Sequence, residues 1–248
     1  MSTSLTVRAA EQEMLILPAT GVRPGSLPIV MCHGAGGAAT SFNLTTLPWQ
    51  FKFGQALEAA GLSISHANLG GTVAPNLGTA TWGNDTVVDR IESARLNLVA
   101  LGCRSDKVGL VGTSMGGISC WSYARANPTK VAAIVAMIPV CDIEDMRPIG
   151  GFGVQIEAAW GIAAGGVLPD RANPNTVANA ALIASSGASI SLYYSTADTT
   201  TRPGPVTQLA AKLGVTPTLF STTLNHSDAQ FEFIPVDTII AQLKAAGA

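Results

Sequence analysis

The stretch Val108–Gly117, VGLVGTSMGG, decides how the rest of the chain is interpreted. It places Gly112, Ser114 and Gly116 in a Gly-x-Ser-x-Gly pattern, directly after a short β-branched apolar run and directly before a helical segment. A serine on a very tight strand-to-helix turn has a strained backbone, and its hydroxyl projects into a cleft. The turn closes only where the residues two positions before and after the serine are almost free of side chain, as glycine is. The stretch therefore predicts a nucleophilic serine at position 114.

The composition argues against several kinds of partner. The chain has 248 residues, of which 47% are hydrophobic and 12% charged, and its net charge is −2. That length suits one α/β domain or two small ones. The charge provides neither a basic footprint for nucleic acid nor a polybasic patch for a membrane. The longest apolar run, Val131–Cys141, is about half of the ~20 residues that a membrane-spanning helix needs. We therefore expect no nucleic-acid partner and no membrane span, and we interpret that run as a buried parallel strand.

Neither the N-terminus nor the cysteines fix a compartment. Residues 1–12 lack a basic start followed by an apolar core, so no signal peptide is evident. The default is a cytoplasmic protein, but the low charge fits an extracellular or virion-associated protein equally well. The cysteines lack metal-ligand spacing and are interpreted as buried free thiols, with a disulfide as the alternative (Cys32, Cys103, Cys120 and Cys141).

Apolar, β-branched runs alternate with helical patterns along most of the chain. The expected strands are Leu5–Ala9, Met14–Leu17, Pro28–Cys32, Leu62–His66, Lys107–Val111, Val131–Ile138, Ile190–Ser195 and Thr216–Ser221. The expected helices are Gln50–Ala60, Thr86–Leu101, Met115–Ala126, Pro205–Leu213 and Val236–Ala246. Two early strands without a helix between them, followed by strand–helix repeats, predict a mostly parallel sheet with a short antiparallel start.

One segment interrupts this alternation. Residues 143–187 separate the sixth and seventh strands and are rich in Gly, Ala, Pro and Asn. Two weakly helical runs, Gln155–Ala163 and Thr176–Ala184, lie within the segment. Because a structureless loop of that length is unusual in a compact domain, we interpret the segment as a small cap over the cleft, within a single domain that spans residues 1–248. The alternative is a peripheral helical insertion that does not contact substrate.

A nucleophilic serine needs a base, an acid that orients the base, and a site for the oxyanion. The chain has three histidines, of which only His226 lies downstream of Ser114. The order serine, acid, histidine is the one that this type of sheet uses, so we predict His226 as the general base. Asp198 follows the seventh strand and is the favoured acid, while Asp142, at the end of the sixth strand, is its rival.

The oxyanion site requires two backbone N–H groups that point at the developing charge. One is expected from Met115, the residue after the nucleophile. The other is expected from the glycine-rich loop His33–Gly37, from Ala35 in the first place and Gly36 in the second. His33 is interpreted as an anchor for this loop rather than as a second base. No phosphate-binding glycine motif follows a strand in the required way, so a nucleotide ligand is not expected.

Together these residues resemble the α/β-hydrolase family. The resemblance rests on His33-Gly34-Ala35-Gly36-Gly37, on Gly112-Thr113-Ser114-Met115-Gly116, and on Asp198 and His226 in the right order, and it covers the chain from about Pro28 onward. It implies an α/β fold with a mostly parallel central sheet of about eight strands, helices on both faces and the cap between strands six and seven. It also implies a Ser-Asp-His triad that works through a covalent acyl-enzyme. Many members have a glycine three residues before the acid, where this chain has Ser195.

The expected function is that of a serine esterase. It would hydrolyse carboxylic esters of small to medium acyl groups, in a small-molecule or polymer substrate, with no metal or organic cofactor. Four aromatic residues are candidates for the acyl pocket: Phe42, Trp82, Phe152 and Trp160. A serine peptidase or amidase would use the same catalytic residues, and a particle-associated esterase or a non-catalytic binding module is a further alternative. The sequence leaves the oligomeric state open.

Overall fold

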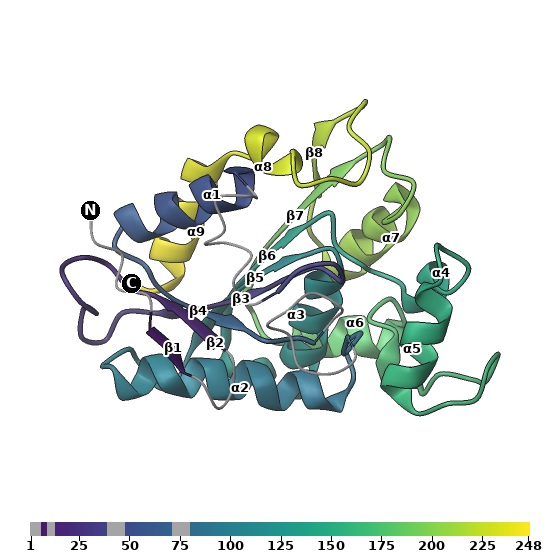
Figure 1. Cartoon of the computed structure of the whole chain (residues 1–248), viewed down its shortest axis with the longest axis horizontal. Coiled ribbons are helices and arrows are strands. Elements are labelled where there is room, and N and C mark those ends of the chain that lie inside the picture. The colour runs from purple at the N-terminus through teal and green to yellow at the C-terminus, as the bar shows by residue number, and fades with distance from the viewer. Residues whose placement is uncertain (1–5, 9–12, 39–47, 71–79) are drawn as a thin grey trace.

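A computed structural model of the chain describes residues 6–8, 13–38, 48–70 and 80–248. These residues form an eight-stranded sheet with helices on both faces (Figure 1). The strands are β1 (Thr6–Arg8), β2 (Glu13–Ile16), β3 (Pro28–Cys32), β4 (Ser63–Ala67), β5 (Val108–Thr113), β6 (Val131–Met137), β7 (Ser189–Ser195) and β8 (Thr218–Ser221). The α-helices are α1 (Pro48–Ala59), α2 (Asp85–Ala100), α3 (Met115–Ala126), α4 (Ile143–Met146), α5 (Phe152–Trp160), α6 (Val177–Ala184), α7 (Pro203–Leu213), α8 (Gln230–Phe233) and α9 (Val236–Ala246).

The strand order confirms the expected sheet. Along the sheet the order is β1-β2-β4-β3-β5-β6-β7-β8. β2 pairs antiparallel with β1 and β4, and all the other neighbouring strands pair parallel. Every residue of β3 and β5 is buried, as in a parallel strand that is covered by helices on both faces. The carboxyl ends of the parallel strands meet at one edge of the sheet, which is where sites are built in this architecture.

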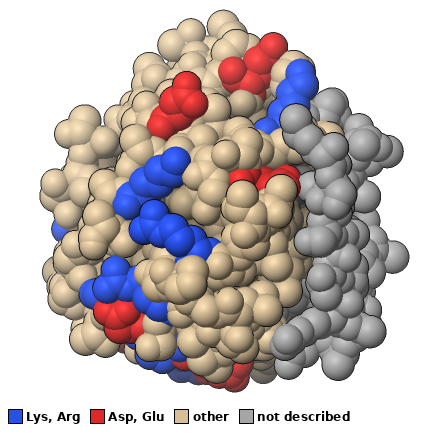
Figure 2. Space-filling model, turned by 90° about the vertical axis from the view of Figure 1, so that its left-hand side faces the viewer, with Lys and Arg blue, Asp and Glu red and all other residues tan. Residues whose placement is uncertain are grey.

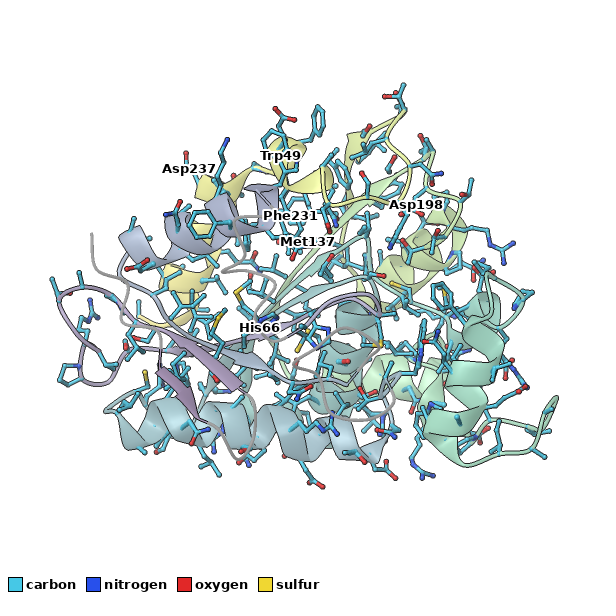
Figure 3. All side chains as sticks on the ribbon, viewed as in Figure 1. Trp49, His66, Met137, Asp198, Phe231 and Asp237 are labelled. Atoms are coloured by element: carbon cyan, nitrogen blue, oxygen red, sulfur yellow. The ribbon has the colours of Figure 1, made fainter. Side chains whose placement is uncertain are left out.

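Each face of the sheet has its own hydrophobic core, because side chains along a strand point alternately to opposite faces. In β3, Val30 belongs to the core beneath α2 and α3, whereas Met31 belongs to the core beneath α1 and α9. Figure 3 shows Met137 and Phe231 on the α1 and α9 side, where both belong to that second core. The sheet is therefore fixed from both faces, and so are the loops that leave its carboxyl edge.

The segment 143–187 contains more helix than expected. Besides α5 and α6, it contains the short helix α4 and a single 3₁₀ turn at Asp170–Ala172. Helix α6 packs against α3 and α7, so it belongs to the helical layer of the sheet. Helix α5 lies beyond the carboxyl edge, at the right of Figure 1, and its first residue, Phe152, lines a pocket at that edge.

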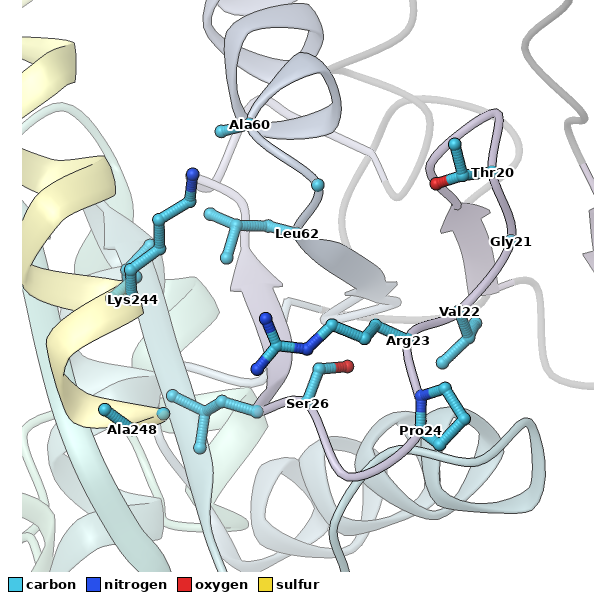
Figure 4. A pocket seen from close by; sticks show the side chains of 14 residues that line it. Thr20, Gly21, Val22, Arg23, Pro24, Ser26, Ala60, Leu62, Lys244 and Ala248 are labelled. Atoms are coloured by element: carbon cyan, nitrogen blue, oxygen red, sulfur yellow. The ribbon is translucent and has the colours of Figure 1, made fainter.

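A second cavity lies at the amino-terminal edge of the parallel strands. Its volume is about 670 Å³, and it is lined by the loop before β3 and by the end of α9 (Figure 4). Arg23 and Lys244 belong to its lining. This cavity shares no lining residue with the pocket at the carboxyl edge.

Figure 2 shows the left-hand side of Figure 1, where uncharged residues predominate and charges of both signs are scattered.

Two expectations from composition can be compared with the described residues. None of their helices is long and apolar enough to cross a membrane. All four cysteines are free and buried, which confirms the interpretation as free thiols.

Candidate active site

Ser114 lies on a strained turn between β5 and α3. Its φ is 52° and its ψ is −120°, in a region that residues other than glycine rarely adopt. Two hydrogen bonds to the end of β6 and the loop after it hold the residue in place. The Ser114 N–H donates to the Met137 carbonyl at 3.1 Å, and the Val140 N–H donates to the Ser114 carbonyl at 2.9 Å. The surrounding structure thus maintains a backbone conformation that the serine alone would avoid.

The glycines around Ser114 are required by close approaches of the backbone. A Cβ atom on Gly112 would lie 2.5 Å from the Gly116 carbonyl oxygen. A Cβ atom on Gly116 would lie 1.9 Å from the Cys32 carbonyl oxygen of β3. The loop after β3 passes beside the serine as well, since a Cβ atom on Gly34 would lie 3.2 Å from the Ser114 Cβ. These contacts bring the turn at Ser114 and the glycine-rich loop against each other.

Ser114, His226 and Asp198 form a hydrogen-bonded row. The His226 Nε2 lies 3.0 Å from the Ser114 Oγ, and the His226 Nδ1 lies 2.8 Å from the Asp198 Oδ2. Because an ionised carboxylate only accepts, the Nδ1–H donates to Asp198, which leaves Nε2 free to accept the serine proton. Asp198 comes from the loop after β7 (Figure 3) and His226 from the loop after β8. The structure therefore brings together the three side chains that the sequence singled out.

The environment of Asp198 favours the ionised carboxylate, although the side chain is buried. Burial raises the pKa of Asp198, but hydrogen bonds from His226 and Thr201 and from the Thr200 N–H outweigh it, so that the pKa lies below its usual value. The Thr200 and Thr201 N–H groups donate to Oδ1 at 2.8 and 2.9 Å, and the Thr201 hydroxyl donates to Oδ2 at 2.8 Å. The carboxylate thus keeps its charge and a fixed orientation beside the imidazole.

The rival acid, Asp142, is hydrogen-bonded elsewhere. Its Oδ1 accepts from the Glu144 N–H at 3.0 Å, at the start of α4, and from the Asn173 side-chain amide at 2.8 Å. Asp142 therefore caps a short helix, and Asp198 is the acid that contacts His226.

Two side chains that the sequence reasoning did not use tie the acid loop to the histidine loop. The Ser195 hydroxyl donates to the Leu224 carbonyl at 2.5 Å. The Asn225 Oδ1 accepts from the Thr199 N–H at 3.1 Å and from the His226 N–H at 2.7 Å. Ser195 stood out in the sequence only as a departure from the family's glycine, and its hydroxyl bonds to the loop that carries His226.

The glycine-rich loop is anchored by His33. The His33 Nε2 accepts from the Leu69 N–H at 3.1 Å, so its Nδ1 carries the hydrogen and donates to the Gly34 carbonyl at 2.8 Å. Among the described residues, the N–H groups of Met115 and Ala35 donate to no acceptor. Ala35 and Gly36 line the pocket beside Ser114. The loop therefore presents backbone close to the serine while its histidine is fully used as an anchor.

This arrangement predicts a pH-dependent stability. Burial lowers the pKa of His33 to about 4, the bond to Gly34 opposes this shift, and the charge of Arg90 adds to it. An unfolded histidine has a pKa of about 6.5, so the unfolded chain gains its proton first as the pH falls. We expect His33 to contribute about 3 kcal/mol to the free energy of unfolding at neutral pH, and this contribution is lost progressively between about pH 6.5 and pH 4.

Denaturant unfolding of the wild type and His33→Gln between pH 7 and pH 4 measures this contribution. The variant is expected to have a shallower dependence of stability on pH in that interval. Equal slopes for both proteins would refute the assignment.

The pocket beside Ser114 has a volume of about 320 Å³. Of the four aromatic candidates, Phe152 lines it. Trp82 lies behind Phe152, with its ring centroid 5.0 Å from the Phe152 centroid, and its Nε1 donates to Gln155 at 3.3 Å. The Trp160 Nε1 donates to the Trp82 carbonyl at 3.1 Å, so this side chain also supports α5. Phe42 lies outside the described residues.

Polar side chains that the sequence reasoning missed form part of the pocket wall. Gln50 comes from α1, Thr113 precedes the serine, and Asp228 and Gln230 follow His226. Gln50 donates through its Nε2 to the Asp228 Oδ1, a contact between residues 178 positions apart. No local pattern could reveal it, because it depends on how α1 packs beside α8.

Comparisons with known proteins identify the family and the fold. The model of the alpha/beta hydrolase family matches residues 29–241, and the chain belongs to that family. The chain is similar in structure to a carboxylesterase of Nitrososphaera gargenis, with 18% identity, 98% of each chain covered and a TM-score of 0.59. It is also similar to an S-formylglutathione hydrolase of Staphylococcus aureus, with 12% identity, 98% of this chain and 97% of that one covered, and a TM-score of 0.68. A monoacylglycerol lipase of Paleococcus ferrophilus has 18% identity, 90% and 97% coverage, and a TM-score of 0.59. None of the curated proteins matches the sequence.

Proposed function

We propose that the chain is a serine hydrolase that cleaves carboxylic esters of small to medium acyl groups. The observation that carries the proposal is the row from Ser114 Oγ through His226 to Asp198, with distances of 3.0 and 2.8 Å, at the wall of a pocket. A nucleophile, a base and an orienting acid in hydrogen-bond contact are the requirements of acyl transfer through a covalent intermediate. The names of the structural neighbours, a carboxylesterase and a lipase among them, support an ester as substrate.

In the first half of the reaction, Ser114 attacks the ester carbonyl carbon. The proton of its hydroxyl moves to the His226 Nε2, and Asp198 stabilises the imidazolium. The carbonyl oxygen becomes an oxyanion that accepts hydrogen bonds from the N–H groups of Met115 and of Ala35 or Gly36. The tetrahedral intermediate then expels the alcohol, which takes its proton from His226. An acyl group remains on Ser114.

In the second half, water replaces the alcohol. His226 removes a proton from the water as it attacks the acyl carbon, and the same backbone N–H groups hold the second oxyanion. Expulsion of the Ser114 oxygen, which takes the proton back from His226, releases the carboxylic acid. The enzyme returns to its starting protonation state without a cofactor.

The pocket supports a preference for short acyl groups. A volume of about 320 Å³ is near the lower limit of about 300 Å³ for ligand pockets. Phe152 at the start of α5 covers part of it, and the hydrogen bonds from Trp82 to Gln155 and from Trp160 to Trp82 hold α5 in place. We assign the part of segment 143–187 that contains α5 as the cap of this pocket.

Hydrolysis of p-nitrophenyl esters from acetate to octanoate tests the function. We expect kcat/KM to be highest at the short end, because longer chains exceed the pocket. Acid quenching during turnover, followed by mass spectrometry of peptides, should find the acyl group on Ser114. Turnover of esters without an adduct on Ser114 would contradict the mechanism, and turnover of amides alone would indicate an amidase.

A further inference from the structure

The pocket beside Ser114 contains a carboxylate without a cationic partner. Asp228 lines the pocket two residues after His226, and its Oδ1 accepts from the neutral Gln50 side chain. No Lys or Arg side chain that the structure describes forms an ion pair with it. Among the described residues, its Oδ2 has no hydrogen-bond donor and is therefore available to a bound molecule.

A second acceptor lies in the same wall. Gln230 is 2% exposed, and its Nε2 donates to the Thr113 hydroxyl at 3.1 Å, so its position is fixed. Its Oε1 is buried and has no donor among the described residues. A buried acceptor without a donor is costly, and a bound donor group would remove that cost.

The charged side chains at this pocket are therefore negative. Its described lining includes Asp228 and no Lys or Arg, and the Asp198 carboxylate lies behind His226. In a cavity of about 320 Å³, every bound group lies within a few ångströms of the wall, where a charge is poorly screened. Such a wall repels an anionic substrate and attracts a cationic one.

We propose that this pocket selects esters with a positively charged nitrogen close to the scissile bond, and that Asp228 is the residue that determines this specificity. The inference rests on the proposed function, since it names the substrate class of the same site. The carboxylate offers a counter-charge, and Gln50 fixes it in place without neutralising it.

Pairs of esters that have the same shape and differ only in charge provide the test. Acetylcholine and 3,3-dimethylbutyl acetate place a charge without an N–H on the alcohol side. 2-(Dimethylamino)ethyl acetate, protonated at neutral pH, and 3-methylbutyl acetate place there a charge whose N–H can also donate to Gln230. The p-nitrophenyl esters of 4-(trimethylammonio)butyrate and 5,5-dimethylhexanoate place it on the acyl side. We expect wild-type kcat/KM to favour the cationic member of at least one pair by about tenfold, with the preference falling as salt is added.

Variants assign the preference to Asp228. Asp228→Asn is expected to reduce it to less than about threefold, because the amide keeps the shape of the side chain and removes its charge. Asp89→Asn is the matched control, since Asp89 is exposed on α2 and outside the pocket, and it should keep the full preference. Choline should also inhibit hydrolysis of the neutral esters by the wild type more strongly than 3,3-dimethylbutanol does, a measurement that needs no variant.

The outcomes separate this inference from the proposed function. Wild-type hydrolysis that treats both members of each pair equally, or a preference that persists in Asp228→Asn, would overturn the inference and leave the serine hydrolase standing. Failure to hydrolyse any ester, neutral or cationic, would overturn both.

Discussion

Replacing Ser114 by alanine is expected to lower kcat/KM for p-nitrophenyl acetate by at least about 10³-fold, and by up to about 10⁶-fold. The variant keeps His226 and Asp198 in place but has no hydroxyl 3.0 Å from the His226 Nε2. Only water remains as a nucleophile, and the backbone N–H groups of the pocket supply the residual rate. The loss should appear mainly in kcat, because the pocket that binds the ester is unchanged. Steady-state kinetics with matched thermal unfolding curves measures both quantities.

Ser119→Ala is the control for this prediction. Ser119 is buried in α3, the helix that follows Ser114, and its hydroxyl donates to the Met115 carbonyl at 3.3 Å. Its activity should stay within about threefold of the wild type, since it loses one weak bond within a helix. A Ser114→Ala protein that is folded and retains a tenth of the wild-type activity would refute the role of Ser114.

The second large effect concerns stability. Gly116→Ala would place a Cβ atom 1.9 Å from the Cys32 carbonyl oxygen and 2.9 Å from the His33 carbonyl oxygen. Both neighbours are backbone atoms of β3 and the loop after it, so neither can rotate away. We expect a loss of about 3 kcal/mol or more, equivalent to a fall in Tm of roughly 6–12 °C for a chain of this length. Thermal unfolding followed by circular dichroism measures the change.

Gly204→Ala is the matched control. Gly204 lies in the first turn of α7, with ordinary backbone angles and open space around the position of a new Cβ. Alanine there should change the stability by no more than about 1 kcal/mol, because the restriction of the unfolded chain is offset by the contact of the new Cβ with the following Pro205. A Gly116→Ala protein with the Tm of the wild type would show that α3 and β3 can separate without cost, contrary to the packing described above.

The elements around Ser114 could be predicted closely from the sequence. Strand β3, helix α3 and helix α9 have the expected bounds. Their limits are marked by residues with clear local preferences, such as the glycines that surround Ser114 and follow the strand. The expected start of α7 was two residues late, because Pro203 and Pro205 both suit a first helical turn. Helices α4 and α8 were missed, since four residues are too few to show a period.

The site was predicted unevenly, for a physical reason. Chain order and strand ends narrow the choice of nucleophile, base and acid, but Asp142 and Asp198 both follow parallel strands. The sequence favours Asp198, and the structure supports that choice by the contact of Asp198 with His226. The pocket wall depends on contacts between distant elements, such as Gln50 with Asp228, which leave no trace in local sequence. The aromatic candidates for the acyl pocket have the same limit. The sequence shows that a ring is present, but it does not show whether the ring faces the pocket.

The hydrogen bonds that join the loop after β7 to the loop after β8 have a consequence for how this site could change. Through these bonds, Ser195 and Asn225 hold the loop of Asp198 against the loop of His226, although the two loops follow different strands, β7 and β8. The proposed proton transfer would cross the bond between the His226 Nε2 and the Ser114 Oγ, which are 3.0 Å apart. Insertions or substitutions around α5 could then change the shape of the pocket without changing the hydrogen bonds among Ser114, His226 and Asp198. We therefore expect changes around α5 to alter the range of substrates while the contacts among Ser114, His226 and Asp198 stay the same.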